Sequence, residues 1–195
     1  MKSLSNLDRY EVLLASASPR RKELLKNLNL KFEIAPIIEV DECFPSTMDV
    51  CDVAKHLSQL KAQAYKKFVT DNQLIITADT VVINNGVVLG KPINAHDARL
   101  MLKSLSGHIH QVITGVTITT IDRQVSFSVN TDVEFAELSS QEIDDYVDAF
   151  MPLDKAGAYG IQEWIGCIGV KNINGSFYNV MGLPLHRLYS ELKKF

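Results

Sequence analysis

The sequence lacks the patterns that mark several large classes of protein. Its three cysteines, Cys43, Cys51 and Cys167, form no CxxC pair and no Cys/His zinc pattern. A sparse, odd set of this kind suits a reducing compartment. No apolar run approaches the roughly 18 residues of a membrane span, and the start of the chain is too polar for a signal-peptide core. We therefore expect a cytoplasmic chain without a membrane partner.

Two common nucleotide-binding motifs are also missing. There is no GxxxxGK[ST] run and no GxGxxG, so neither a P-loop enzyme nor an ordinary dinucleotide-binding protein is indicated. The formal net charge of -3 argues against a broad basic face for nucleic acid. Any anion site must therefore be local. No repeat or Pro/Gly/Ser-rich linker divides the chain, which predicts one domain over residues 1–195.

The composition that is present predicts an α/β fold. Hydrophobic residues make up 46% of the 195 residues, enough for a well-packed core. Strand and helix patterns alternate along the chain, which favours a mixed twisted sheet flanked by helices. Two long β-rich runs, 108–120 and 124–135, are expected to extend this sheet into a second lobe, with a cleft between the two lobes.

The periodicity of apolar residues and the turn signals define the expected elements. Strands are predicted over 10–15, 31–38, 73–82, 87–89, 108–120 and 124–135, with a further hairpin over about 167–179. Helices are predicted over 20–28, 48–68, 95–105, 139–152 and 185–194, after a polar lead-in over 1–9. Ser139 and Glu142 have the spacing of a capping box. His108 and His110 are expected on one strand face in structural roles.

The stretch LLASASPRRKELL over residues 13–25 places cations where a helix begins. Ser18 occupies an N-cap position, Pro19 the first helical position, and Arg20 and Arg21 the first turn. Cations there add to the positive end of the helix dipole. With Ser16, the stretch could form a polyphosphate cradle. The alternative is a strand–turn–helix with two solvated arginines, and this stretch alone leaves both open.

Asp79 interrupts the most apolar predicted strand, LIITADTVV. Burying a carboxylate there is costly unless a cation or metal pairs with it, although the strand could also end at Asp79 and expose it. Lys61 and Lys91 are either solvated or directed at a ligand, and Trp164 could stack on a base or pack in the core.

Further polar clusters are Asp41-Glu42 and Asp154-Lys155 with Gln162. Carboxylates with lysines and arginines, and no Ser–His or Cys–His pairing, point to metal-assisted chemistry on a phosphate.

Five blocks in this order closely resemble the Maf family of nucleoside triphosphate pyrophosphatases. They are LASASPRRKELL, ADTVV followed by LGKP, LSGHIHQVITGV, DKAGAYGIQ and NVMGLPL. The resemblance runs from about Val12 to Leu192. It implies an elongated α/β fold with a long twisted mixed sheet, similar to the inosine triphosphatase (Maf/Ham1) group. It also implies an enzyme that hydrolyses a nucleoside triphosphate to the monophosphate and pyrophosphate with a divalent metal.

The block DKAGAYGIQ resembles the subgroup that acts on dTTP and UTP, and modified pyrimidine nucleotides are further candidate substrates. By position, Asp79 corresponds to the proton acceptor, and Arg20, Thr80 and Gln162 correspond to specificity positions. The remaining polar positions of the family's pocket match Ser16, Arg21, Glu42, Lys61 and Lys91.

The resemblance implies catalytic roles for four of these residues, namely Asp79, Glu42, Lys61 and Lys91. Glu42 and Asp79 would be the ligands of a Mg²⁺ or Mn²⁺ ion, and whether Asp79 acts mainly as base or metal ligand stays open. The Gln162 amide, with one donor and one acceptor side, suits the O4 and N3–H edge of thymine or uracil.

Alternative functions follow from the same resemblance. A nucleotide-binding regulator of cell division or septum formation, with little turnover, is the main one, and a purine-specific enzyme is another. The continuation Glu163-Trp164 departs from the glycine-rich sequence of many family members and could alter base choice. From the family alone, a homodimer is compatible with this chain.

Overall fold

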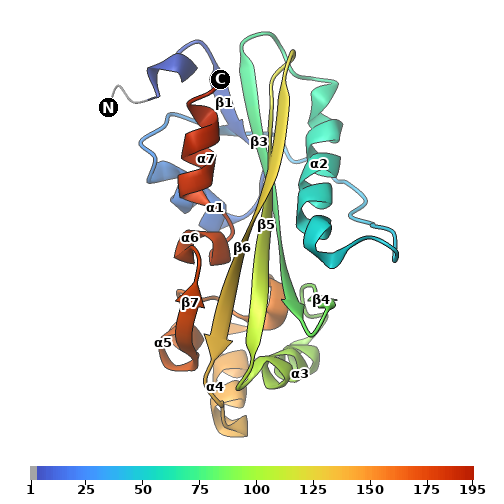
Figure 1. Ribbon diagram of the computed structural model, residues 1–195, viewed down its shortest axis with the longest axis vertical. Coiled ribbons are helices and arrows are strands. Elements are labelled where there is room, and N and C mark those ends of the chain that lie inside the picture. Colours follow the sequence, from blue (N-terminus) through green and yellow to red (C-terminus); the bar gives the residue numbers. More distant parts are fainter. Residues whose placement is uncertain (1–3) are drawn as a thin grey trace. The chain divides into compact units, whose positions relative to one another are not determined.

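The computed structural model describes residues 4–195, which form a seven-stranded mixed sheet with helices packed against it (Figure 1). The strands follow the order β2-β1-β3-β5-β6-β7, and β4 pairs with β3. β1 is parallel to both β2 and β3, whereas β4 is antiparallel to β3 and β7 is antiparallel to β6. The predicted mixed α/β sheet is therefore confirmed.

Most elements have bounds close to those expected from the sequence, but the helix predicted over 48–68 is the α-helix Val53–Lys66, preceded by a short 3₁₀ turn. The strands are β1 (Glu11–Leu14), β2 (Glu33–Ile34), β3 (Gln73–Asn84), β4 (Val87–Leu89), β5 (Ile109–Thr119), β6 (Gln124–Phe135) and β7 (Val170–Asn174). The helices are α1 (Pro19–Lys26), α2 (Val53–Lys66), α3 (Ala95–Leu105), α4 (Ser140–Phe150), α5 (Trp164–Gly169), α6 (Phe177–Val180) and α7 (Leu185–Leu192). Short 3₁₀ turns are η1 (Ser5–Leu7), η2 (Val50–Asp52) and η3 (Ala156–Ala158). Within residues 4–195, every helix is too short or too polar to cross a lipid bilayer.

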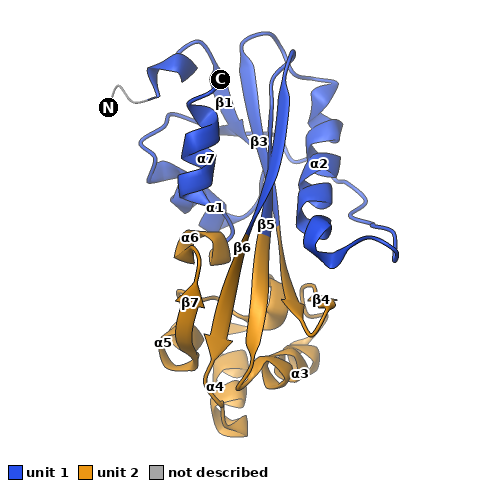
Figure 2. Cartoon of the chain, viewed as in Figure 1, with its two compact units in different colours: residues 1–79, 114–129, 182–195 blue, residues 80–113, 130–181 orange. Residues whose placement is uncertain are grey.

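The described chain divides into two compact units (Figure 2). Unit 1 contains the residues up to 79 together with 114–129 and 182–195. Unit 2 contains residues 80–113 and 130–181. β3, β5 and β6 each contribute residues to both units.

In unit 1, a glycine and three hydroxyl groups fix the position of α2. A Cβ at Gly115 in β5 would lie 2.2 Å from the Ala54 carbonyl oxygen, so only glycine permits this close approach of helix and strand. The Ser58 hydroxyl lies 2.9 Å from the Thr117 hydroxyl, and Thr77 donates to the Ser58 carbonyl at 2.7 Å. α2 is therefore held against β3 and β5, and Lys61 follows about one turn after Ser58.

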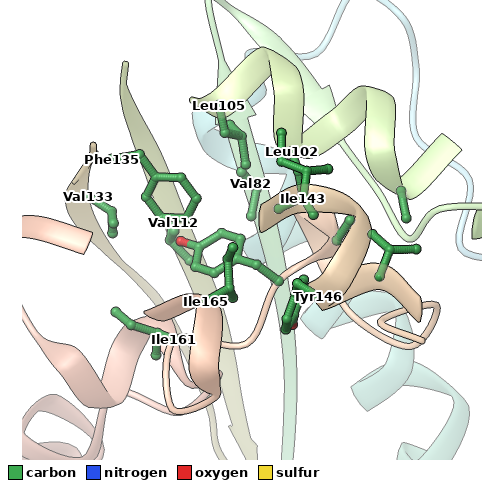
Figure 3. Packing of buried hydrophobic residues seen from close by; sticks show 14 residues of the cluster. Val82, Leu102, Leu105, Val112, Val133, Phe135, Ile143, Tyr146, Ile161 and Ile165 are labelled. Carbon is green, nitrogen blue, oxygen red and sulfur yellow. The ribbon is translucent and has the colours of Figure 1, made fainter. Parts of the chain in front are cut away.

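The core of unit 2 is apolar and contains several aromatic rings (Figure 3). Its buried residues are Val82, Ala98, Leu102, Leu105, Val112, Val133, Phe135, Ile143, Tyr146, Val147, Ala158, Tyr159, Ile161 and Ile165. His110 packs edge-on against Phe135 and Tyr159, with ring centroids 5.0 and 5.4 Å away. The shared face predicted for both histidines is wrong, because β5 begins at Ile109 and leaves His108 outside the strand and exposed.

The strand expected over 31–38 is limited to Glu33–Ile34. After β2, the Tyr65 side chain makes hydrogen bonds to the backbone that a neighbouring strand would otherwise make. Its hydroxyl donates to the Pro36 carbonyl at 2.8 Å and accepts from the Ile38 N–H at 3.2 Å. These backbone groups are satisfied without a longer β2.

Two other expectations also need correction. The hairpin over 167–179 is absent from the described chain, because β7 pairs with β6 and the residues after Gly175 enter α6 with Ser176 as N-cap. In the lead-in, residues 1–3 lie outside the described residues. Leu4 and Leu7 are buried around η1, so the following residues are not a polar extension.

Candidate active site

Lys61 joins two carboxylates in unit 1. Its Nζ lies 2.5 Å from Asp79 Oδ1 and 3.0 Å from Glu42 Oε1. The Asp79 and Lys61 side chains are 13% and 18% exposed, whereas Glu42 is 50% exposed. The ion pair therefore compensates the cost of placing Asp79 within an apolar strand. Of the two interpretations open for Lys61, the structure excludes a freely solvated side chain.

Arg21 links three segments of unit 1 through its guanidinium. Nη1 donates to the Ala78 carbonyl at 2.9 Å, and Nε donates to the Gly182 carbonyl at 2.9 Å. Nη1 also lies 3.5 Å from Ser16 Oγ. Burial lowers the pKa of Arg21, and the charge of Asp79 opposes this shift. The arginine at the start of α1 thus holds the β3 backbone immediately before Asp79.

The local structure around α1 agrees with the sequence. The Ser18 side chain accepts a hydrogen bond from the Arg21 N–H, and Pro19 is the first helical residue. Ser16 Oγ accepts from the Ser18 N–H at 3.2 Å. Arg20 is half-buried and lies close enough for its charge to lower the pKa of Arg21 further, while Glu42 raises it.

Six predicted site residues therefore belong to one cluster in unit 1. They are Ser16, Arg20, Arg21, Glu42, Lys61 and Asp79. The three others, Thr80, Lys91 and Gln162, belong to unit 2. Thr80 follows Asp79 in β3 and is half-buried, whereas Lys91 and Gln162 are exposed.

A second polar cluster lies in unit 2 beside Gln162. Glu163 Oε1 is 3.1 Å from Lys155 Nζ, and the Tyr146 hydroxyl donates to Glu163 Oε2. Tyr146 was not predicted from the sequence as a polar group of interest. In the sequence, Tyr146 is marked only by its position on the apolar face of the helix that becomes α4. That position also fits an ordinary core tyrosine.

The donor set in unit 1 fits a divalent cation that is shared with a phosphate. Glu42 and Asp79 both direct an oxygen at one positive group, the ammonium of Lys61. Mg²⁺ is commonly bound by one or two carboxylates together with substrate phosphate oxygens. Within residues 4–195, no group of three or more His, Cys, Asp or Glu side chains could hold a metal ion.

Comparison with known proteins gives this geometry a context. A family model described as "Maf-like protein" matches residues 11–195. The chain belongs to the Maf family. It is 54% identical to a dTTP/UTP pyrophosphatase of Phocaeicola vulgatus, over 98% of this chain and 99% of that protein. It is 53% identical to a protein of the same name in Parabacteroides distasonis, over 98% and 100% of the two chains.

A solved structure of a HAM1 protein from Coxiella burnetii is also similar to this Maf chain. It has 15% sequence identity and a TM-score of 0.48, and the match covers 95% of this chain and 100% of that one.

Proposed function

We propose that this Maf protein is a nucleoside triphosphate pyrophosphatase that hydrolyses dTTP and UTP to the monophosphate and pyrophosphate. The observation that carries the proposal is the Asp79 carboxylate, held by Lys61 at the point where Arg21 fixes the β3 backbone. The names of the relatives in Phocaeicola vulgatus and Parabacteroides distasonis support the substrate.

In the proposed reaction, the oxygen of a water molecule attacks the α-phosphorus and the bond from that phosphorus to the bridging oxygen breaks. Pyrophosphate leaves with the electron pair of the broken bond. Asp79 accepts the proton of the attacking water, as the resemblance implies. Lys61 orients the Asp79 carboxylate through the 2.5 Å contact and offsets negative charge that develops on the phosphates.

Glu42 and Asp79 are the residues that we assign to a divalent cation, Mg²⁺ or Mn²⁺. Such a cation would neutralise phosphate charge and polarise the oxygens of the reacting group. The 50% exposure of Glu42 keeps its side chain accessible to an ion that arrives with the nucleotide. When no nucleotide is bound, the Lys61 ammonium contacts both carboxylates.

The other predicted residues are assigned to the substrate. Ser16, Arg20 and Arg21 would serve the phosphates, and Arg21 also positions the β3 backbone through Ala78. Lys91 would offset charge on the leaving pyrophosphate. Thr80 and Gln162 would contribute to specificity, the latter through the O4 and N3–H edge of the pyrimidine.

The test is a panel of nucleoside triphosphates assayed for pyrophosphate release with Mg²⁺ and with Mn²⁺. We expect dTTP and UTP to be the best substrates, and faster release from ITP or 7-methyl-GTP would contradict the substrate assignment. Asp79→Asn should abolish release while nucleotide binding is largely retained, because the amide cannot accept the proton.

The regulatory alternative is less favoured, because these relatives are named as enzymes. Nucleotide binding by the wild-type protein without turnover would support it. The two lobes, the homodimer, the absence of a nucleic-acid partner and the cytoplasmic location stay predictions.

A further inference from the structure

A buried ion pair lies immediately after Gln162 in unit 2. Lys155 is 8% exposed, and its Nζ lies 2.7 Å from Asp154 Oδ1 and 3.1 Å from Glu163 Oε1. The Glu163 side chain is 19% exposed. A lysine this far from water requires a carboxylate partner, and Glu163 is the less exposed of its two.

Tyr146 completes this group from α4. Its hydroxyl donates to Glu163 Oε2 and accepts from the Gly160 N–H at 3.1 Å. Burial first, and then the hydrogen bond to Glu163, raise the pKa of Tyr146 well above its ordinary range. The hydroxyl therefore keeps its proton at neutral pH and continues to act as donor to Glu163.

These contacts enclose a turn that contains Gln162. The Glu163 N–H donates to the Gly160 carbonyl at 2.9 Å, which closes residues 160–163 into a turn. Ile161 enters the apolar core of unit 2 (Figure 3). Gln162 itself is exposed, so its backbone is fixed on both sides while its side chain is free to meet a ligand.

Two glycines show how closely this turn is packed. A Cβ at Gly160 would lie 2.7 Å from the Glu163 carboxyl carbon. A Cβ at Gly166 in α5 would lie 1.9 Å from the Ile161 carbonyl oxygen. The turn is thus confined by the Glu163 carboxylate on one side and by the α5 backbone on the other, with little space for an alternative conformation.

We propose that Lys155, Glu163 and Tyr146 form a positioning network that fixes the Gln162 turn and thereby sets the choice of pyrimidine base. This inference rests on the proposed function, and these three residues are positioning residues without direct contact to the substrate.

The chemistry of an amide explains why such a network is needed. Uracil and thymine present an acceptor at O4 and a donor at N3, whereas cytosine presents a donor at N4 and an acceptor at N3. A glutamine amide rotated by half a turn complements cytosine as well as it complements uracil. Gln162 alone therefore cannot separate UTP from CTP, and selectivity requires fixed neighbouring groups that favour one of the two amide orientations, which a mobile turn cannot supply.

The test compares the ratio of kcat/KM for UTP to that for CTP in Glu163→Gln, Tyr146→Phe and Gln162→Ala. We expect each single variant to lower this ratio by about tenfold, mainly through a higher KM for UTP. Glu163→Gln and Tyr146→Phe loosen the turn, Gln162→Ala removes the amide itself, and the reacting groups are unchanged in all three. Glu163→Gln combined with Gln162→Ala should lower the ratio no further than Gln162→Ala alone, since both changes act through one side chain.

Lys171→Met is the matched control, because it removes the exposed ion pair with Glu134 elsewhere in unit 2. It should leave the ratio unchanged. Hydrogen exchange at the Gly160 amide provides a readout without turnover: Tyr146→Phe should accelerate it at least about tenfold relative to Lys171→Met.

The outcomes distinguish a failure of the proposed function from a failure of the positioning network. Wild-type protein that releases no pyrophosphate from dTTP or UTP overturns the proposed function and this inference with it. An active wild type whose folded Glu163→Gln and Tyr146→Phe variants keep the UTP to CTP ratio within twofold overturns the network alone. Effects of Glu163→Gln and Gln162→Ala that multiply in the double variant also overturn it. If Glu163→Gln or Tyr146→Phe fails to fold, the other variant and the hydrogen-exchange rate of the Gly160 amide test the network.

Discussion

Lys61 is the residue on which both carboxylates of the unit 1 cluster converge. Without Lys61, the Asp79 carboxylate would be an unpaired charge in an apolar strand. The ion pair that holds Glu42 near Asp79 would also be lost. Lys61 therefore contributes to folding by compensating the Asp79 charge, and it also fixes where the Asp79 oxygens lie.

Replacement of Lys61 by methionine tests whether its charge also acts in catalysis. We expect Lys61→Met to lower kcat for UTP about 100-fold, because a preorganised positive charge at the phosphates is lost. Lys66→Met is the control, since Lys66 is exposed on the same helix. Steady-state pyrophosphate release measures both variants, and equal rates in the two would exclude a catalytic role for Lys61.

His110 gives a prediction for the pH dependence of stability. Burial lowers the pKa of His110 to about 4 from an ordinary 6.5, and among the described residues its Nδ1 has no hydrogen-bond partner. Between these values the unfolded chain binds a proton that the folded chain does not. Stability is therefore lost as the pH falls from 6.5 toward 4.

At pH 5 this linkage should cost about 2 kcal/mol of unfolding free energy relative to pH 8. Urea denaturation at both pH values measures it. His110→Asn should reduce the difference between the two pH values, whatever its effect on stability at pH 8. If His110→Asn kept the full pH dependence of the wild type, the loss of stability at pH 5 would arise from other titratable groups.

At the scale of elements, Gly115 determines how closely α2 approaches β5. Gly115→Ala should lower the unfolding free energy by about 2 kcal/mol or more, because the added methyl group meets helix backbone that cannot move locally. Gly90→Ala is the control, since a Cβ there meets no heavy atom within 4 Å. Chemical denaturation compares them. Similar stabilities would mean that α2 shifts without cost.

Elements with strong local signals were predicted well. The capping box of Ser139 and Glu142 is present, and β4, α3 and β6 have the expected bounds. The errors lie where distant residues decide the structure. No local pattern shows that the Tyr65 hydroxyl binds the backbone near Pro36 and so shortens β2, or that β7 pairs with β6 instead of forming a hairpin.

At the scale of the whole molecule, the sequence predicted the residue types of the site better than their contacts. Apolar neighbours marked Asp79 as a buried charge that needs a partner, but only the fold identifies that partner as Lys61, 18 positions earlier. Likewise, Arg21 was predicted as a phosphate ligand, and its bonds to the Ala78 and Gly182 carbonyls depend on chain segments far apart in sequence.

Metal removal tests how the site relates to the stability of the molecule. Lys61 already compensates Glu42 and Asp79, so the folded chain does not require a cation to offset these carboxylates. A chelator should therefore abolish pyrophosphate release from UTP and change Tm by less than about 1 °C, unlike proteins in which metal binding supplies folding energy. Calorimetry and an activity assay on the same sample measure both, with restoration by Mg²⁺ as control. A large fall in Tm on chelation would show that the metal stabilises the fold. Pyrophosphate release that continues in the presence of the chelator would show that the reaction needs no metal.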